Sequence, residues 1–282
     1  MILELRDIAF AYKAKGSFGK TVLNGFDLSV GLGECVGVIG QEGSGKTTLL
    51  QLMNGLLKPD RGTVHIDGCD IWQAPESIAR LRRRIGFAFQ FPEQQFFCET
   101  VHDELLYAKL NFRDLSNSDY TTPEEALESV GLHPSQFLER SPFTLSMGEA
   151  RRVALATVLM TKPEALLLDE PTVGLDGRGI ECVVSLLRKV KDQGVTTVLV
   201  SHDVDVLAEV ASRIVILDWG RARNDLPVQE IFTDEELLSA YGYQLPEVVR
   251  FMAEHDKRNG RSERQFYTMN EAGTLLRSGR LI

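Results

Sequence analysis

The segment GQEGSGKT, residues 40–47, constrains the fold of this chain more than any other part of its sequence. It follows the run ECVGVI at residues 34–39, which is short and apolar enough to be a buried strand. It matches the pattern G-x-x-x-x-G-K-[ST], in which the backbone N–H groups of a glycine-rich loop converge on phosphate oxygens at the start of a helix. The sequence therefore predicts a strand, a phosphate-binding loop and a helix in that order.

The residues of this loop have separate expected tasks. Glycines permit the tight backbone, Lys46 would neutralise the β- and γ-phosphates, and the Thr47 hydroxyl would bind Mg²⁺. The residues predicted to bind nucleotide here are Gly40, Gly43, Ser44, Gly45, Lys46, Thr47 and Thr48. Because kinases, GTPases and ATPases share such a loop, residues further along the chain must distinguish them.

Two adjacent acids end a second apolar run, ALLLDEP at residues 165–171. Asp169, at the end of the expected strand, is placed to hold Mg²⁺ through water. Glu170 projects beyond it and is a candidate base for the attacking water. Such a pair is often only surface charge, but after a phosphate-binding loop the catalytic interpretation is favoured.

The stretch TLSMGEARRVALA, residues 144–156, narrows the class of protein. Ser146 and Gly148 lie just before a helix that we expect to begin near Glu149. A hydroxyl and free N–H groups at the positive end of a helix would form a second phosphate-binding surface. Taken by itself, the stretch favours a simple N-cap followed by a charged first turn.

The order of these motifs resembles that of the ATP-binding-cassette (ABC) ATPases over most of the chain, up to about residue 225. The matching segments are Tyr12 as the adenine-stacking aromatic, GQEGSGKT as Walker A, Gln90 as the Q-loop glutamine, LSMGE as the signature, LLLDEP as Walker B, GLD ending at Asp176 as the D-loop, and His202 as the switch histidine. Strands that alternate with helices also predict a parallel sheet covered on both faces. The expected fold is an α/β P-loop cassette with an amino-terminal antiparallel β-subdomain, a mainly parallel core sheet, a helical subdomain at about residues 92–150 and a small helical appendage.

The resemblance implies a head-to-tail pair of cassettes with ATP and Mg²⁺ between them. Ser146 and Gly148 would then contact the γ-phosphate in the partner's site, and Asp176 would communicate across the pair. Within one site, His202 would contact the γ-phosphate and help to position the water polarised by Glu170. Gln90 would sense the Mg²⁺ and that water.

Two residues of the signature depart from the family pattern. Met147 stands where glycine is usual, and Glu149 stands where glutamine is usual. Ser146 and Gly148, which bear the main phosphate contacts, are retained. We therefore expect the signature to function.

Among cassettes, the sequence favours a transport subunit. It has no sustained heptad run, no zinc-type cysteine spacing and only one set of motifs. The segment FQFPEQQFFCETVHDEL, residues 89–105, resembles the corresponding part of the energy-coupling-factor importers. Its aromatic side chains could form an apolar groove for a coupling helix of a membrane partner, or could cover the core of the helical subdomain. The residues concerned are Phe89, Phe91, Phe96 and Phe97, with Pro92 holding the shape of the loop.

The carboxyl-terminal extension, residues 226–282, is expected to be helical and to assist dimerisation. The segment FTDEELLSAYG, residues 232–242, predicts a helix with Thr233 as N-cap and Gly242 as its stop. The next stretch, residues 241–260, resembles the Leu-Pro-x-Val-Val tail of energy-coupling cassettes. An apolar stripe in it could be a partner surface or could pack within the chain; its members are Leu245, Val248, Val249 and Met252.

Charge and hydropathy limit the partners. A net charge of -9 argues against general nucleic-acid binding. No apolar run approaches the roughly 18 residues that span a bilayer. The resemblance to energy-coupling-factor importers implies a peripheral protein at the cytoplasmic face of the cell membrane, with an identical or different second cassette, a transmembrane coupling protein and a substrate-binding membrane protein. Its expected function is ATP hydrolysis that powers uptake of a vitamin or transition-metal ion; the alternative is a soluble, non-transport ABC ATPase or regulatory cassette.

Overall fold

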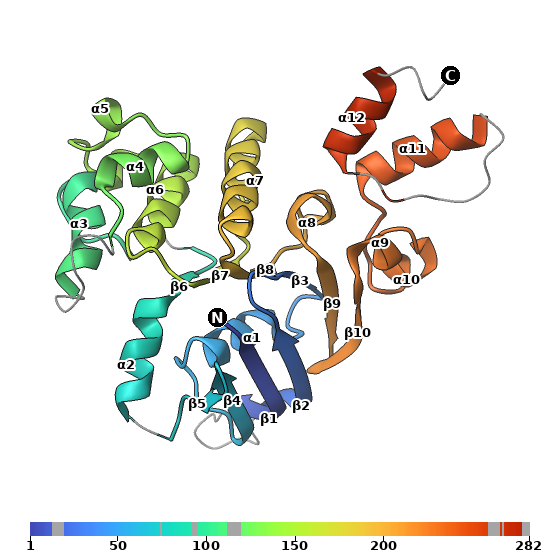
Figure 1. Ribbon diagram of the computed structural model, residues 1–282, viewed down its shortest axis with the longest axis horizontal. Coiled ribbons are helices and arrows are strands. Elements are labelled where there is room, and N and C mark those ends of the chain that lie inside the picture. Colours follow the sequence, from blue (N-terminus) through green and yellow to red (C-terminus); the bar gives the residue numbers. More distant parts are fainter. Residues whose placement is uncertain are drawn as a thin grey trace.

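Two β-sheets form the centre of the computed structural model, which describes residues 1–12, 20–73, 75–91, 95–111, 120–258, 266 and 268–277 (Figure 1). The first sheet is antiparallel, with the order β2-β1-β4-β5. Its strands are β1 (Leu3–Tyr12), β2 (Lys20–Val30), β4 (Arg61–Ile66) and β5 (Cys69–Asp70). The expected antiparallel β-subdomain at the amino terminus is thus confirmed.

The second sheet has the order β10-β9-β3-β8-β7-β6, and all its pairs are parallel except that of β9 with β10. Its strands are β3 (Cys35–Ile39), β6 (Ile85–Ala88), β7 (Ala165–Asp169), β8 (Thr196–Val200), β9 (Arg213–Asp218) and β10 (Arg221–Pro227). Parallel strands need crossover connections, which place helices on both faces. The predicted mainly parallel core sheet is confirmed.

Strand β3 illustrates why these strands are apolar on both faces. Val36 and Val38 contact a core that includes helix α1 (Lys46–Met53) and the first sheet. Cys35 and Ile39 point the other way, into a core that includes α7 (Gly177–Asp192) and α8 (Val204–Val210). Because side chains alternate across a strand, a strand between two cores must be apolar throughout.

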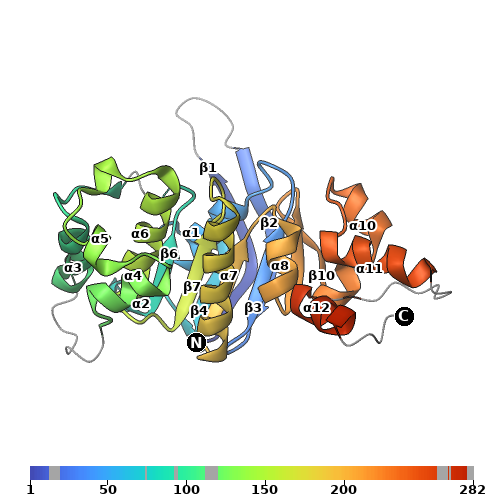
Figure 2. The ribbon, with the colours of Figure 1, turned by 90° about the horizontal axis from the view of Figure 1, so that it is seen from above.

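The helices after β6 form a group at one end of the molecule (Figure 2). They are α3 (Val101–Asn111), α4 (Pro123–Ser129), α5 (Pro134–Phe137), the 3₁₀ helix η3 (Pro142–Thr144) and α6 (Met147–Leu159). A further helix, α2 (Pro75–Arg84), precedes β6. In α4 the Thr122 hydroxyl accepts a hydrogen bond from the backbone N–H of Glu125, whose carboxylate accepts one from the backbone N–H of Thr122. This reciprocal pair is a capping box and fixes the start of the helix.

Helix α6 begins at Met147, two residues before the start predicted near Glu149. Ser146 is its N-cap, and the side chain of Glu149 completes a second capping box. Gly148 therefore lies within the first turn rather than before the helix. The prediction was wrong because Glu149 occupies the third helical position, from which it reaches back to the cap.

The carboxyl-terminal helices lie at the opposite end from α3–α6 (Figure 2). They are α9 (Val228–Ile231), α10 (Glu235–Ala240), α11 (Glu247–Arg258) and α12 (Met269–Arg277). The N-cap of α10 is Asp234, whose carboxylate accepts from the backbone N–H of Leu237. Thr233, the predicted cap, instead donates its hydroxyl to the carbonyl oxygen of Gln229. Gly242 follows the helix with φ +81°, so the predicted stop is confirmed.

The apolar stripe of the extension packs within the chain. Each of its members is 5% exposed or less. Val248, Val249 and Met252 form a small core with Ala272 of α12, while Leu245 belongs to the large core. This stripe is therefore not an exposed partner surface. Buried side chains of α9 and α10 also belong to the large core, and a domain boundary near residue 225 stays a prediction.

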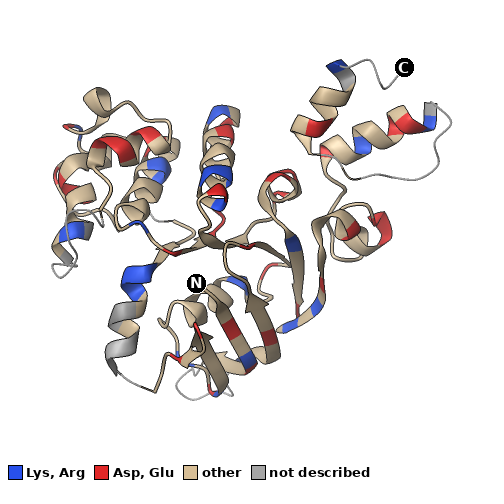
Figure 3. Ribbon diagram, viewed as in Figure 1, with Lys and Arg blue, Asp and Glu red and all other residues tan. Residues whose placement is uncertain are grey.

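Helices α7 and α11 each carry charged residues of both signs (Figure 3). In the part of the chain that the structure describes, none of the helices combines the length and the apolar character needed to cross a membrane.

Candidate nucleotide-binding site

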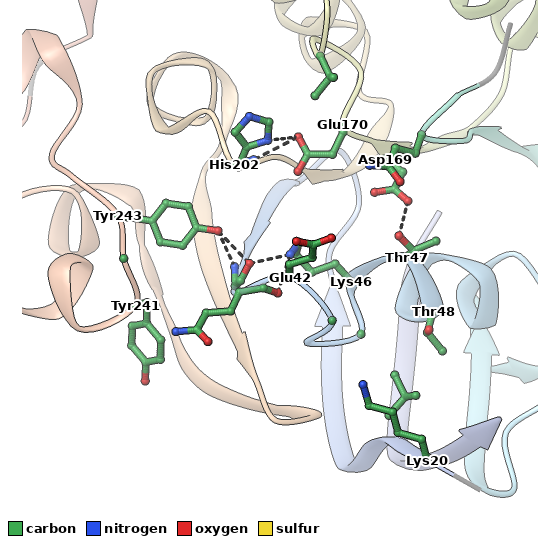
Figure 4. A pocket seen from close by; sticks show the side chains of 18 of the residues that line it. Lys20, Glu42, Lys46, Thr47, Thr48, Asp169, Glu170, His202, Tyr241 and Tyr243 are labelled. Atoms are coloured by element: carbon green, nitrogen blue, oxygen red, sulfur yellow. Dashed lines mark hydrogen bonds and ion pairs between the residues drawn. The ribbon is translucent and has the colours of Figure 1, made fainter.

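A cavity of about 760 Å³ opens where strands β3 and β7 end, beside the predicted phosphate-binding loop (Figure 4). The predicted site residues that line it are Tyr12, Gly40, Gly43, Gly45, Lys46, Thr47, Thr48, Gln90, Asp169, Glu170 and His202. Lys20, Glu42, Tyr241 and Tyr243 line it as well. The fold thus gathers residues from seven separate parts of the chain around one cavity.

The loop at residues 40–45 is shaped to hold an anion. Gly45, with φ +110°, is the N-cap of α1, and a Cβ atom there would come within 2.9 Å of Val22. A side chain at this position would be strained and crowded. The Ser44 hydroxyl is buried and has no hydrogen-bond partner among the described residues. A buried orphan hydroxyl beside a helix amino terminus fits a bound phosphate oxygen.

Lys46 reaches back across this loop. Its ammonium donates to the carbonyl oxygens of Gly40 (2.6 Å) and Gln41 (3.0 Å). Burial lowers the pKa of Lys46, and the nearby carboxylates of Glu170, Asp169 and Glu42 act in the opposite direction. The Lys46 side chain is thus held at the mouth of the loop, where phosphate oxygens would replace the two carbonyls.

Thr47 and Asp169 bring two oxygen atoms together beside the loop. The Thr47 hydroxyl donates to the Asp169 carboxylate at 2.7 Å. Burial raises the pKa of Asp169, and the bond from Thr47 and the charge of Lys46 lower it in part. A hydroxyl and a carboxylate are ligands that Mg²⁺ prefers, so this pair fits the metal. Gln90, the third predicted ligand, is exposed and lines the same cavity.

Glu170 and His202 are directly bonded. Nδ1 of His202 lies 2.8 Å from the Glu170 carboxylate, which also accepts from the backbone N–H of His202 at 3.2 Å. Glu170 is 8% exposed and has φ +52°. This left-handed conformation is strained in a residue with a side chain, and such strain clusters at functional sites. The side chain is aimed into the cavity and fixed there by the histidine.

Tyr12 lies at the edge of the cavity and is 47% exposed. Its ring contacts Phe10 edge-on, with the ring centroids 5.0 Å apart. Its hydroxyl lies 3.2 Å from that of Thr48 and donates to the Gln51 side chain at 3.3 Å. These contacts orient the ring at the cavity without covering it.

Ser146, Gly148 and Asp176 lie outside the lining of this cavity as the described residues define it. Ser146 caps α6, and Asp176 caps α7 by accepting from the backbone N–H of Gly179. The start of α6 lies against the D-loop, since a Cβ atom on Gly174 would come within 2.6 Å of the Met147 methyl group and one on Gly148 within 3.5 Å of Leu175. The signature and the D-loop therefore form one surface, separate from the phosphate-binding loop of the same chain.

Sequence reasoning missed Arg151, which is 1% exposed. Its guanidinium donates to the carbonyl oxygens of Gln90 (2.6 Å), Glu170 (3.3 Å) and Val173. It thereby joins the signature helix to the Q-loop and to the turn after β7. The sequence feature that could have revealed Arg151 is its position as a charged residue on a helix face that is otherwise apolar.

Two of the four aromatic side chains near Gln90 pack against other residues of the same chain. Phe89 packs against Phe87, with ring centroids 4.1 Å apart. Phe96 is partly buried against the large core. For Phe96 the alternative in which the aromatic side chains cover the core is therefore observed, whereas Phe89 contacts a neighbouring residue of β6.

The other two are exposed, Phe91 by 45% and Phe97 by 56%. The Phe97 ring meets Tyr107 edge-on at 4.4 Å. The buried carboxylate of Glu104 accepts from the backbone N–H groups of Phe97 and Cys98, which fixes this part of the loop. Pro92, which was expected to hold its shape, lies outside the described residues.

Comparisons with known proteins agree with this arrangement. The family model described as ABC transporter matches residues 23–173. The energy-coupling factor transporter ATP-binding protein EcfA2 of Clostridium perfringens is 33% identical over 277 residues, which cover 98% of this chain and 97% of that protein. The protein of the same name from Symbiobacterium thermophilum is 37% identical over 270 residues, covering 96% and 93%.

Solved structures show the same fold. The structure of cbiO1 from Clostridium perfringens, described as part of the ABC transporter complex cbiONQ, aligns with a TM-score of 0.73 at 28% identity and covers 92% of this chain and 96% of that one. A dimeric post-hydrolysis state of the ATP-binding cassette MJ0796, bound to ADP and Pi, aligns with a TM-score of 0.72 at 29% identity, covering 80% and 99%. This chain therefore belongs to the ABC transporter family, and within it is a relative of the ATP-binding proteins of energy-coupling factor transporters.

Proposed function

We propose that this chain binds and hydrolyses ATP to energise an energy-coupling-factor importer for a vitamin or a transition-metal ion. The observation that carries the proposal is the cavity in which Lys46, the Thr47–Asp169 pair and the Glu170–His202 pair face one phosphate-binding loop. The similarity to EcfA2 proteins over nearly the whole chain supports the transport role.

The residues of the cavity divide the work of phosphoryl transfer to water. Backbone N–H groups of residues 40–45 and the Lys46 ammonium hold the β- and γ-phosphates. Thr47, Asp169 and Gln90 would hold Mg²⁺, which neutralises phosphate charge. Glu170 accepts a proton from the attacking water, and His202 keeps that carboxylate in place and contacts the γ-phosphate. Tyr12 stacks on the adenine.

The active unit is a head-to-tail pair of cassettes, identical or different. Ser146 and Gly148 present the amino terminus of α6 to the γ-phosphate held by the partner, and Asp176 passes the state of one site to the other. The physical support is that these residues form a surface of helix starts outside their own chain's cavity. A helix amino terminus favours an anion through its free N–H groups and its dipole.

The remaining partners are a transmembrane coupling protein and a substrate-binding membrane protein, which hold this chain at the cytoplasmic face of the membrane. Phe91, Phe97, Tyr107 and Leu110 are exposed apolar side chains after the Q-loop, and we name them the post-Q-loop surface. An apolar surface of this kind suits a short amphipathic helix. Gln90 connects it to the nucleotide.

The substitution Glu170→Gln tests the hydrolytic role. The variant keeps the shape of the side chain but removes the base, so we expect ATP binding to persist while hydrolysis falls by about 10²- to 10⁴-fold. ATP should then accumulate a stable dimer, detected by light scattering during gel filtration. Adding Gly148→Asp should abolish that dimer, because a carboxylate would face the phosphate. Normal turnover by Glu170→Gln would remove Glu170 from the catalytic role.

A further inference from the structure

The carboxyl-terminal extension makes a direct hydrogen-bonded contact with the phosphate-binding loop. Tyr243, between α10 and α11, extends its ring into the site (Figure 4). Its hydroxyl accepts from the backbone N–H of Gly40 and donates to the carbonyl oxygen of Gly40, each at 3.0 Å. One side chain from the end of the fold thus holds both polar groups of the first glycine of the loop.

Gly40 depends on such backbone partners for its position. Its φ is +152°, and a Cβ atom there would clash with the carbonyl oxygen of Leu217. The residue therefore has no side chain with which to anchor itself. Its carbonyl oxygen accepts from two donors, the Lys46 ammonium at 2.6 Å and the Tyr243 hydroxyl.

We propose that Tyr243 is a positioning residue for ATP binding, which holds the Gly40 backbone in its phosphate-binding conformation from the carboxyl-terminal extension. The proposal rests on the proposed function, in which Lys46 leaves the Gly40 carbonyl to contact phosphate. Tyr243 then remains as the donor to that oxygen. Without the hydroxyl, a partly buried carbonyl loses its partner whenever ATP takes the lysine, and this weakens ATP binding.

The protonation of Tyr243 suits this task. Burial raises the pKa of its hydroxyl above the ordinary value of 10, and the charge of Glu170 acts in the same direction, while the bond to Gly40 opposes them. The phenol therefore keeps its proton at neutral pH and can donate to the carbonyl.

The carboxyl-terminal extension that carries Tyr243 is also hydrogen-bonded to α8, the helix that follows His202. The Asp205 carboxylate of α8 accepts from the backbone N–H of Glu247, at the start of α11, at 2.6 Å. Glu209 of α8 accepts from the backbone N–H of Met269, at the start of α12. Because coupling between two sites is reciprocal, ATP that favours the Tyr243–Gly40 contact must also stabilise the docked extension.

Tyr243→Phe in the full-length chain tests the proposal, since it removes one oxygen atom and keeps the ring. We expect the Kd for the non-hydrolysable analogue AMP-PNP and the KM for ATP to rise about two- to tenfold, as for one hydrogen bond, with kcat changed less than about twofold. The matched control is Tyr120→Phe, which removes a hydroxyl bonded to the Lys109 carbonyl oxygen in the helical subdomain and should change neither constant. Affinity and KM that equal those of the control would overturn the proposal.

Two further measurements separate this proposal from the proposed function and from a general loss of stability. Lys46→Ala should abolish AMP-PNP binding; if it does not, the proposed function fails, whereas normal binding by Tyr243→Phe alone refutes only the role of Tyr243. Hydrogen exchange reports the reciprocal effect. AMP-PNP should slow amide exchange in residues 243–252 of the wild type and not in Tyr243→Phe, and equal slowing in both would also count against the proposal.

Discussion

Glu170 adopts a backbone conformation that a residue with a side chain seldom occupies, and the contacts around it explain how that conformation persists. Its φ of +52° would be costly in an isolated turn. The buried guanidinium of Arg151 donates to the carbonyl oxygens of Glu170 and Val173, and His202 holds the carboxylate. The strained residue is thus held from the protein interior on one side and from the cavity on the other.

Replacing Arg151 by methionine should destabilise the fold and slow hydrolysis together. The guanidinium bonds to three carbonyls in a buried place, so we expect the free energy of unfolding to fall by about 3 kcal/mol. Turnover should fall as well, because the turn that carries Glu170 loses its support. Urea unfolding and steady-state ATPase rates measure the two effects.

Arg152→Met is the matched control, since Arg152 is only partly buried and donates to the carbonyl oxygens of Gly148, Val130 and Gly131 at 3.2–3.4 Å. It should cost less than about 1 kcal/mol. Equal losses in the two variants would mean that Arg151 has no special role.

At the residue scale, the sequence predicts the residues that would bind or react with ATP better than it predicts the residues that hold their backbone in place. Lys46, Thr47, Asp169 and Glu170 belong to short patterns whose residue types the reaction itself requires, and all of them line the cavity. Arg151 and Tyr243 bond to backbone carbonyls 61 and 203 residues away along the chain. Which carbonyls the fold leaves available is decided by packing, so no local pattern marks these two residues.

At the scale of elements, the start of α6 combines a structural and a functional demand. Glu149 completes the capping box with Ser146, and its carboxylate lies 3.5 Å from Arg140. The backbone N–H of Ser146 is the largest cause that lowers the pKa of Glu149 below its ordinary 4.5; burial opposes it and Arg140 assists. A carboxyl group whose pKa is lowered by folding stabilises the protein above its unfolded pKa, and this contribution disappears as the pH falls through the folded value.

Glu149→Gln should therefore make the protein less sensitive to acid. The amide oxygen still accepts from Ser146, but the loss of charge at a helix amino terminus costs about 0.3–1 kcal/mol at neutral pH. As the pH falls below the ordinary pKa of 4.5 and through the lower pKa of the folded state, the wild type loses its advantage, so the difference in Tm between the two proteins should shrink. Glu139→Gln, at an exposed glutamate outside any helix start, serves as the control. A difference in Tm that stays constant with pH would contradict the assignment.

The starts of the helices show how much of the element structure can be predicted from local sequence. The capping box at Thr122 can be read from the sequence alone, because threonine, proline and glutamate stand at the cap, the first and the third helical positions. The cap of α10 was misplaced by one residue because Thr233 and Asp234 can both act as caps. The fold selects Asp234, and Thr233 bonds to the preceding turn instead. Tertiary packing chooses between two local solutions of similar energy.

At the scale of the whole molecule, the helical subdomain and the carboxyl-terminal extension lie at opposite ends of the core sheet (Figure 1). The post-Q-loop surface belongs to the first end, and the contact between Tyr243 and Gly40 belongs to the second. The cavity proposed to hold ATP lies between them, and both Gln90 and Gly40 line it. Under the proposed function, a membrane partner at the post-Q-loop surface and the extension would respond to the same ATP without contacting one another.

Phe97→Asp should release the membrane partner while leaving the fold intact. Phe97 is more than half exposed, so a charge there costs little stability, but it would have to be desolvated against an apolar coupling helix. Co-purification of the hydrophobic subunits in detergent should be lost, with Tm and ATP affinity of the isolated chain unchanged. Phe96 is a poor site for this test, because it packs on the core and its replacement would also destabilise the subdomain.

Trp219→Asp is the control for a charge on an exposed aromatic residue elsewhere, since Trp219 is 83% exposed in the turn between β9 and β10. It should keep the membrane partner. If Phe97→Asp retained the partner as fully as Trp219→Asp does, the post-Q-loop surface would not be the docking site. Loss in both variants would show that the complex is sensitive to surface charge in general and would equally remove the argument for Phe97. Only if the membrane partner is lost from Phe97→Asp and kept by Trp219→Asp is the post-Q-loop surface the place where ATP hydrolysis is coupled to that partner.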